Sequence, residues 1–358
     1  MRYHSTRGGT DTSSSFEEVL LSAYARDGGL YVPDRIPSLA TADRLQRYID
    51  ERYDFPRICA EVVHLYSDID IDALVAMTSI AFSQFNQATA SGVDHDHDQP
   101  TTSHTVTKEV LPMHFLADKN MHLLDLSLGP TYAFKDIGQQ MCGQLLNYYL
   151  GRKNQTAKVC VDTSGDTGPA AIAGVRGCSN VEIYCLYPRG RVTPIQELQM
   201  ITVLDANVHV YRTDGDSDEQ ASVLKELFQD EQFMKTHNIC CVNSINWARI
   251  AVQSSYYVWS YVSLCQRGLI AQDDNAMVNY AIPTGAFGNA MGCYLAKLMG
   301  IPIRRIYCAT NNNDIVHRTL SSGDMRMGEN IQVYLLSVCL HTHLDCNGAL
   351  FMNSDCTE

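Results

Sequence analysis

One lysine of this sequence stands where a turn is predicted to pass into a helix. It is Lys135, within the decapeptide Gly129-Pro130-Thr131-Tyr132-Ala133-Phe134-Lys135-Asp136-Ile137-Gly138. Its neighbours are partly aromatic and almost uncharged, and burial in such a setting disfavours the ammonium form. A neutral amine is what Schiff-base formation with an aldehyde requires. The plain alternative is a helix-start lysine whose amine reaches water, and this segment alone favours that alternative.

Two glycine-rich segments downstream strengthen the chemical interpretation. Ser164–Gly168 follows the apolar run Val159–Val161, and Gly285–Asn289 follows Val278–Ile282. Each is predicted to join a strand to a helix, whose first N–H groups can bind a carboxylate or a phosphate. A plain capped turn explains the first segment equally well, and a lone glycine loop is weak evidence. Together with the lysine, however, they suit pyridoxal phosphate, which needs an amine, a phosphate nest and a clamp for the substrate carboxylate.

Short apolar runs alternate with amphipathic segments from Leu111 onward, which predicts a parallel sheet covered by helices on both faces. The two loops are expected on this one sheet, because ligands bind at the carboxyl ends of parallel strands. The predicted strands are 159–161, 182–187, 208–212, 239–242, 278–282 and 305–308. Helices are predicted from Ile137 to Gly151, after the Thr193 cap, and over 219–228, 246–267 and 290–299.

Changes of composition divide the 358 residues into four parts. These are an N-terminal domain (1–88), a polar insert or loop (89–107), a catalytic α/β region (108–324) and a divergent tail (325–358). The insert contains an Asp/His alternation at 94–98, and the tail contains Cys339, His341, His343 and Cys346. Neither has the spacing and support of a functional metal site, so no metal is predicted, and the tail is expected to be unstructured or badly packed.

Composition restricts the class of protein further. A hydrophobic content of 45% is enough for a substantial core, and a net charge of −13 argues against nucleic acid and anionic membrane as partners. No apolar run approaches the ~20 residues of a membrane span, and the first residues lack an apolar signal core. The 13 cysteines are odd in number and several lie in apolar runs, which predicts free thiols in the cytoplasm. Secretion of a variant stays open as an alternative.

Residues 1 to about 325 resemble the threonine synthases, which are fold-type II pyridoxal-phosphate enzymes. The matching segments are 3–8, 28–33, 129–136, 164–168, 187–190, 243–246 and 310–314. Finer motifs resemble the threonine synthase-like 2 branch of this family, at 195–200, 207–210, 246–249 and 314–319. The resemblance implies an α/β fold with parallel sheets flanked by helices and a cofactor cleft between two domains.

The same resemblance assigns roles to individual residues. It implies that Lys135 forms the Schiff base and that the cofactor phosphate is held by Gly285, Ala286, Phe287, Gly288 and Asn289. It places the substrate beside Ser164, Gly165, Asp166, Thr167, Asn243, Asn246 and Asn313. Each of the three asparagines could equally be a structural cap or turn residue.

The activity implied by the resemblance is elimination of phosphate from O-phosphohomoserine, with O-phosphothreonine as a second substrate, to give 2-oxobutyrate, ammonia and phosphate. A threonine synthase that makes L-threonine from O-phosphohomoserine is the first alternative. A truncated, catalytically impaired or signalling variant is the second. Three departures bear on the choice: Ala286 replaces the family's usual Asn, Ser127-Leu128 replaces Phe-His, and the resemblance ends near 325, where family members continue.

Overall fold

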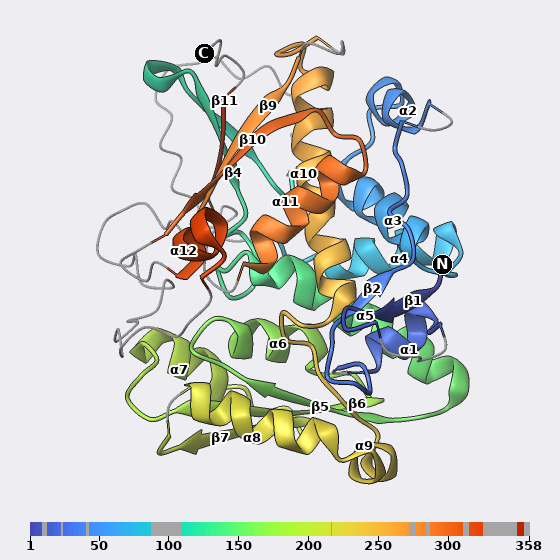
Figure 1. Ribbon diagram of the computed structural model, residues 1–358, viewed down its shortest axis with the longest axis vertical. Coiled ribbons are helices and arrows are strands. Elements are labelled where there is room, and N and C mark those ends of the chain that lie inside the picture. Colours follow the sequence, from blue (N-terminus) through green and yellow to red (C-terminus); the bar gives the residue numbers. More distant parts are fainter. Residues whose placement is uncertain are drawn as a thin grey trace.

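The computed structural model describes residues 1–8, 13–22, 24–40, 43–86, 109–215, 217–271, 276–283, 287–310, 315–324 and 349–353 (Figure 1). Within these residues the strands form three sheets and the helices pack around them. No helix of this part of the chain is long and apolar enough to cross a membrane. The fold is the predicted mixed α/β class with parallel strands flanked by helices.

One sheet has four strands, all parallel, in the order β7-β6-β5-β8. Alternate residues of its central strand β5 are buried, as expected for a strand covered by helices. Helices α6 and α8 both pack on β5 and β6. The elements of this region are β5 (Ala157–Asp162), α6 (Thr167–Val175), β6 (Val181–Pro188), α7 (Pro194–Ile201), β7 (Val208–Thr213), α8 (Ser217–Gln229), α9 (Glu231–His237) and β8 (Ile239–Cys240).

The other large sheet has five strands in the order β10-β9-β11-β4-β3. Strands β9 and β10 are parallel, whereas β11 is antiparallel to both β9 and β4, and β3 is antiparallel to β4. The elements associated with it are β3 (Met113–Leu116), the 3₁₀ helix η3 (Ala117–Lys119), β4 (Met121–Asp125), β9 (Val278–Pro283), α11 (Gly288–Leu298), β10 (Ile303–Ala309), α12 (Ile315–Ser322) and β11 (Ala349–Asn353).

Two expectations about the strands are therefore wrong. The strands do not share one sheet, because β8 ends the four-stranded sheet and the long helix α10 intervenes before β9. The tail is not wholly without structure, because β11 lies between β4 and β9 and gives both of them a hydrogen-bonding partner. An unpaired strand edge is a site that readily accepts an added strand, which explains why a short segment of the tail pairs there.

Helix α10 (Trp247–Gln266) is buried along nearly its whole length and joins the regions of the molecule. It packs against α11, against α3 (Phe55–Tyr66), and against α5 (Lys135–Lys153). Three of its serines donate their hydroxyls to carbonyls of the same helix, so these buried polar groups have hydrogen-bond partners. These bonds are Ser254 Oγ to Ala251 O (2.7 Å), Ser255 Oγ to Val252 O (2.5 Å) and Ser260 Oγ to Tyr257 O (2.9 Å).

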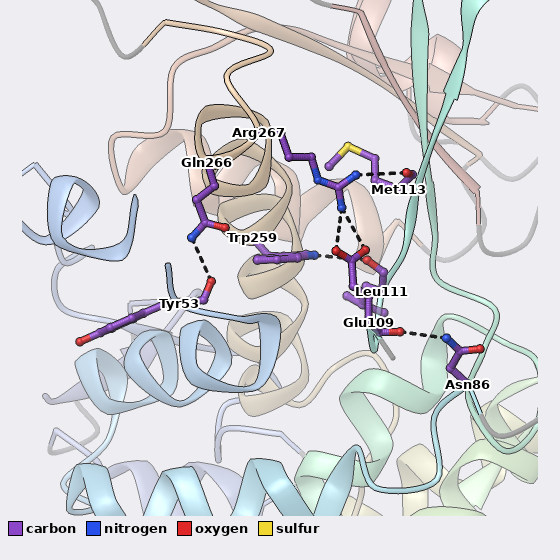
Figure 2. A network of polar contacts seen from close by, with 8 residues as sticks. All are labelled: Tyr53, Asn86, Glu109, Leu111, Met113, Trp259, Gln266 and Arg267. Atoms are coloured by element: carbon purple, nitrogen blue, oxygen red, sulfur yellow. Dashed lines mark hydrogen bonds and ion pairs between the residues drawn. The ribbon is translucent and has the colours of Figure 1, made fainter. Parts of the chain in front are cut away.

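The C-terminal end of α10 fastens the segment that begins at Glu109 (Figure 2). Arg267 Nη2 lies 2.9 Å from both carboxylate oxygens of Glu109, and Trp259 Nε1 donates to Leu111 O at 3.4 Å. On the other side of the gap, Asn86 Nδ2 donates to Glu109 O at 3.1 Å. The two ends that flank the predicted polar insert therefore lie next to each other.

The N-terminal region covers α10 and α5. Tyr3 and Tyr66 place their rings 6.3 Å and 5.7 Å from that of Trp247, and Tyr3 Oη donates to Tyr66 O at 2.5 Å. Its elements are β1 (Tyr3–Ser5), α1 (Phe16–Leu20), β2 (Tyr31–Pro33), α2 (Arg44–Asp50), α3 and α4 (Ile71–Ala81). Helix α5 continues past the predicted end at Gly151 to Lys153, because Asn154 takes the left-handed conformation (φ 51°) that closes it.

Candidate active site

The turn before Lys135 is built around a buried carboxylate. Asp136 accepts hydrogen bonds from Thr131 N (2.8 Å) and Thr131 Oγ1 (2.7 Å), and burial raises the pKa of Asp136 to about 6. Residue 129 must be glycine, because a Cβ there would lie 2.4 Å from Asp136 Oδ2. Tyr132 takes a left-handed conformation (φ 58°) and completes the turn. This framework makes Lys135 the first residue of α5.

The amine of Lys135 lies in a mostly buried position, with 18% of the side chain exposed. Its Nζ is 3.5 Å from Asp166 Oδ2 and 5.9 Å from the centre of the Phe134 ring. Burial is the main cause that lowers the pKa of Lys135, Asp166 opposes this shift, and the Arg249 cation adds to it. The site therefore eases loss of the ammonium proton, which is the condition for nucleophilic chemistry at this nitrogen.

The loop Ser164–Thr167 lies at the carboxyl end of β5 and leads into α6. Buried Thr163 shapes it, since its hydroxyl accepts from Gly165 N (3.0 Å) and Gly168 N (2.9 Å). Gly165 has φ 148°, and a Cβ at this position would lie 2.5 Å from Gln196 Oε1. Asp166 is the member of the predicted set that directly contacts Lys135. The remaining loop residues stand at the N-terminus of α6, where an anion is stabilised.

The three predicted asparagines have different surroundings. Asn246 caps α10, with Oδ1 accepting from Ala248 N (3.0 Å) and Nδ2 donating to Leu20 O and Cys241 O (2.9 Å each). It is buried with its side chain fully used, so the structure assigns it the capping role that the sequence left open. Asn243 Nδ2 donates to Asp162 Oδ1 at 2.5 Å, but its buried Oδ1 has no hydrogen-bond partner among the residues that the structure describes. Asn313 lies outside the described residues.

The predicted phosphate loop is described only from Phe287 onward, and Gly285 and Ala286 lie outside the described residues. Phe287 is left-handed (φ 63°) and Gly288 is the first residue of α11. The side chain of Asn289 turns away from the helix start, because its Oδ1 accepts from both Tyr256 Oη and Tyr257 Oη at 2.5 Å. What this segment can offer to an anion is therefore its backbone N–H groups at the start of α11.

Sequence reasoning missed a buried arginine beside this site. Arg249 is 2% exposed, its Nη1 donates to Val242 O at 3.1 Å, and its buried Nε has no hydrogen-bond partner in the described part of the chain. The Nε lies 3.7 Å from the position that a Cβ of Gly138 would take, one turn along α5 from Lys135. Arg249 is the only Asp, Glu, Lys or Arg residue between 247 and 266, and that isolation was a signal in the sequence.

These features fit pyridoxal phosphate. A partly buried lysine amine, two helix N-termini, and the orphaned acceptor of Asn243 meet the needs of an aldehyde, two anionic groups and a hydrogen-bond donor. Among the described residues, no group of three or more His, Cys, Asp or Glu side chains is arranged to hold a metal ion. The chemistry of the donor set is that of a Schiff-base site.

Two family models match the chain. "Threonine synthase N terminus" matches residues 2–82, and "Pyridoxal-phosphate dependent enzyme" matches residues 109–333. The chain is 39% identical to the threonine synthase of Schizosaccharomyces pombe, over 92% of this chain and 61% of that protein. It is 37% identical to the human threonine synthase-like 2, over 94% and 64%.

Solved structures give the same result. Yeast threonine synthase is 35% identical with a TM-score of 0.76, over 92% of this chain and 62% of that one. The pyridoxal-phosphate-bound threonine synthase from Brucella melitensis is 34% identical with a TM-score of 0.76, over 93% and 65%. The chain thus spans about three fifths of the length of the fungal relatives that it matches.

Proposed function

Because this chain belongs to the threonine synthase family of pyridoxal-phosphate-dependent enzymes, we propose that it eliminates phosphate from O-phosphohomoserine. With one water consumed, the products are 2-oxobutyrate, ammonia and phosphate, and O-phosphothreonine is proposed as a second substrate. The observation that carries this proposal is the Lys135 amine, mostly buried and 3.5 Å from Asp166, at the start of α5. The partner is accordingly a small phosphorylated amino acid.

Lys135 is proposed to perform two tasks. Its neutral Nζ binds the cofactor aldehyde, and once released it takes the proton from the substrate Cα as general base. The bound cofactor supplies the electron sink that makes this carbon acidic. The lowered pKa of Lys135 favours both tasks near neutral pH, since a protonated amine can neither attack nor accept a proton. Asp166 is placed to receive a hydrogen bond from the nitrogen while it carries that proton.

The two helix N-termini are proposed to hold the anionic groups. The start of α11, at Phe287–Asn289, would bind the cofactor phosphate through backbone N–H groups. Gly285 and Ala286 precede it in the sequence and are proposed for the same role. The Ser164–Thr167 loop at the start of α6 would bind the substrate, with Asn243 and Asn313 proposed beside it. Asn243 supports this assignment because its buried amide oxygen lacks a partner.

Threonine synthesis is the second candidate, and a specific observation favours it. The fungal threonine synthase is 39% identical to this chain, slightly more than the 37% of the human threonine synthase-like 2. The same α-proton abstraction and loss of phosphate serve both outcomes. They differ in whether water adds to Cβ, giving L-threonine, or the nitrogen is lost by hydrolysis, giving the 2-oxo acid. Water placement in the closed site decides between them.

The test is a product analysis on purified protein. Pyridoxal phosphate is added, the visible band of the lysine-bound cofactor is recorded, and O-phosphohomoserine is supplied. Phosphate with equimolar 2-oxobutyrate and ammonia is the expected result, whereas phosphate with equimolar L-threonine would replace the lyase by the synthase. Folded protein that gives neither the band nor phosphate would refute both. Lys135→Ala is the matched control for reactions that free cofactor catalyses.

Two broader features accompany this proposal. The division into 1–88, 89–107, 108–324 and 325–358 is part of the proposal, and family models that match 2–82 and 109–333 separately support the separation of its first and third parts. The described residues include ten free cysteines, and burial raises the pKa of four fully buried ones, Cys59, Cys142, Cys185 and Cys241, to about 12. Free thiols support a reducing compartment such as the cytoplasm.

A further inference from the structure

Helix α7 directs two glutamines, one turn apart, at the loops around Lys135. Gln199 Nε2 donates to Thr131 O at 3.1 Å, in the turn that precedes the lysine. Gln196 Nε2 donates to Asp166 Oδ1 at 2.6 Å, in the loop that faces the lysine. The first contact ends on a backbone carbonyl, whereas the second ends on an ionisable group next to the amine. Of the two glutamines, Gln196 is therefore the one bonded to an ionisable group that itself contacts Lys135.

The amide of Gln196 has a fixed orientation. It belongs to a capping box in which Thr193 N donates to Gln196 Oε1 (3.0 Å) and Gln196 N donates to Thr193 Oγ1 (3.3 Å). Because the oxygen is held by a backbone N–H, the nitrogen must be the atom that faces Asp166. Gln196 is 5% exposed, so water competes little for these bonds. The cap of α7 thus presents a fixed donor to the carboxylate.

The Asp166 carboxylate lies between Gln196 and Lys135 and contacts both. One carboxylate oxygen accepts from Gln196 at 2.6 Å, and the other lies 3.5 Å from Lys135 Nζ. The close approach depends on residue 165, where a Cβ would lie 2.5 Å from Gln196 Oε1 and 2.7 Å from its Cδ. A side chain at 165 would push the glutamine out of its place. The contact between Gln196 and Asp166 therefore requires glycine at residue 165.

We propose that Gln196 is a positioning residue for Lys135: it fixes the plane of the Asp166 carboxylate and thereby sets how strongly Asp166 holds the lysine proton. The inference rests on the function proposed above for Lys135. Other charged and titratable groups also face this cluster. Arg249 acts on Lys135 from α10, Asp136 faces Asp166 from α5, and Cys142, Cys241 and Tyr256 face Arg249. Among the described residues, the side-chain hydrogen bonds of Gln196 go to Thr193 and Asp166 and to none of these groups, which makes a substitution there selective.

The test uses Gln196→Glu in the full chain loaded with pyridoxal phosphate. The glutamate can still accept from Thr193 N, so the cap of α7 is kept. The substitution replaces the donor to Asp166 by a second acidic group. Two carboxyl groups beside Lys135 favour the protonated form of the lysine nitrogen. The visible absorbance of the lysine-bound cofactor is titrated with pH. We expect the midpoint to rise by about one pH unit, and kcat at neutral pH to fall and recover at higher pH.

Two variants distinguish positioning from a structural effect. Gln196→Met removes the donor without adding charge, so Asp166 loses its orientation and we expect the midpoint to fall. Gln199→Glu adds the same charge one turn along α7 without touching Asp166, and we expect its midpoint to stay at the parent value. Folding of each variant is checked by circular dichroism and by cofactor stoichiometry. If Gln196→Glu fails to fold, the opposite shift in Gln196→Met carries the test.

The outcomes separate this inference from the proposed function. Folded Gln196 variants that keep the parent midpoint, or a shift in Gln199→Glu as large as in Gln196→Glu, would overturn the positioning role. A parent protein that binds no cofactor through Lys135 would instead overturn the proposed function. Midpoints that shift in opposite directions in the glutamate and methionine variants would support the route from Gln196 through Asp166.

Discussion

The starts of helices α5 and α11 are stabilised in different ways. The start of α5 is surrounded by charged and titratable groups: the acids Asp136 and Asp166, the amine of Lys135 and the permanent cation of Arg249. The start of α11 is held by neutral hydroxyls, since Tyr256 and Tyr257 both donate to Asn289, and burial raises the pKa of each tyrosine far above its usual range. We call the start of α5 the lysine side and the start of α11 the α11 side. The stability and charge of the lysine side should change with pH, whereas the stability of the α11 side should depend on packing alone.

Lys135→Ala tests this contrast with the largest expected effect. Removing the nucleophile and base should lower kcat by about 10⁴-fold or more and abolish the visible cofactor band. Because the amine makes a long ion pair of 3.5 Å with Asp166, the fold should be kept. Phosphate release and circular dichroism measure the two quantities. Turnover near the parent rate would remove Lys135 from its proposed role.

Asp136 should make the stability of the lysine side depend on pH. Burial raises its pKa from 3.8 to about 6, so the folded protein holds this proton more tightly than the unfolded chain. The resulting stability is complete below about pH 4 and is lost as the pH rises through about 6. The shift of two units corresponds to about 3 kcal/mol in the free energy of unfolding.

Urea denaturation between pH 4 and pH 7 measures this contribution, with Asp136→Asn as the comparison. The asparagine cannot titrate, so the free energy of unfolding of the parent relative to Asp136→Asn should fall by about 2 kcal/mol as the pH rises from 4 to 7. A constant difference between pH 4 and pH 7 would show that Asp136 titrates alike in the folded and unfolded protein.

Arg249→Met should change the lysine side by removing its buried cation. The pKa of Lys135 should rise, because Arg249 is one of the causes that lower it, and the rate at neutral pH should fall by about tenfold. The carbonyl of Val242 keeps a donor, since Gln139 Nε2 also bonds to it at 2.9 Å. The absorbance titration described for Gln196 measures the shift, and a lower midpoint would contradict the sign predicted here.

Tyr257→Phe is the corresponding change on the α11 side and should have the smallest effect. It removes one of two donors to Asn289, which should lower the free energy of unfolding by about 1 kcal/mol. The midpoint of the absorbance titration should stay unchanged, because no charge near Lys135 is altered. If the midpoint moved, the two sides of the site would be electrostatically coupled and the contrast between them would fail.

The sequence predicted local features better than pairings between distant segments. Lys135 at a helix start, the capping box at Thr193 and most strands followed from turn chemistry and apolar periodicity. The separation into two large sheets did not, because strand order depends on contacts between segments far apart in sequence. The strand Ala349–Asn353 was missed for the same reason, since its partners β4 and β9 lie far upstream.

Within the site, residue type predicted which residues lie near Lys135 better than it predicted what each of them does. Asn246 had the residue type expected near a substrate, but the capping bonds that occupy it are visible only in the folded structure. Asp166 was predicted as a loop residue, whereas its contact with Lys135 required the two loops to be brought together by the packing of α5 on α6. The isolated charge of Arg249 was visible, but the unpaired state of its Nε among the described residues was not.

The hydrogen bond between Asn86 and Glu109 has a consequence for engineering this chain (Figure 2). Glu109 is also fastened to the end of α10, so both ends of the 87–108 segment are anchored to the same place. The entropy of closing a loop between fixed ends grows only by about 0.6 kcal/mol for each doubling of its length. This point of the chain should therefore accept a reporter domain or a much shorter linker.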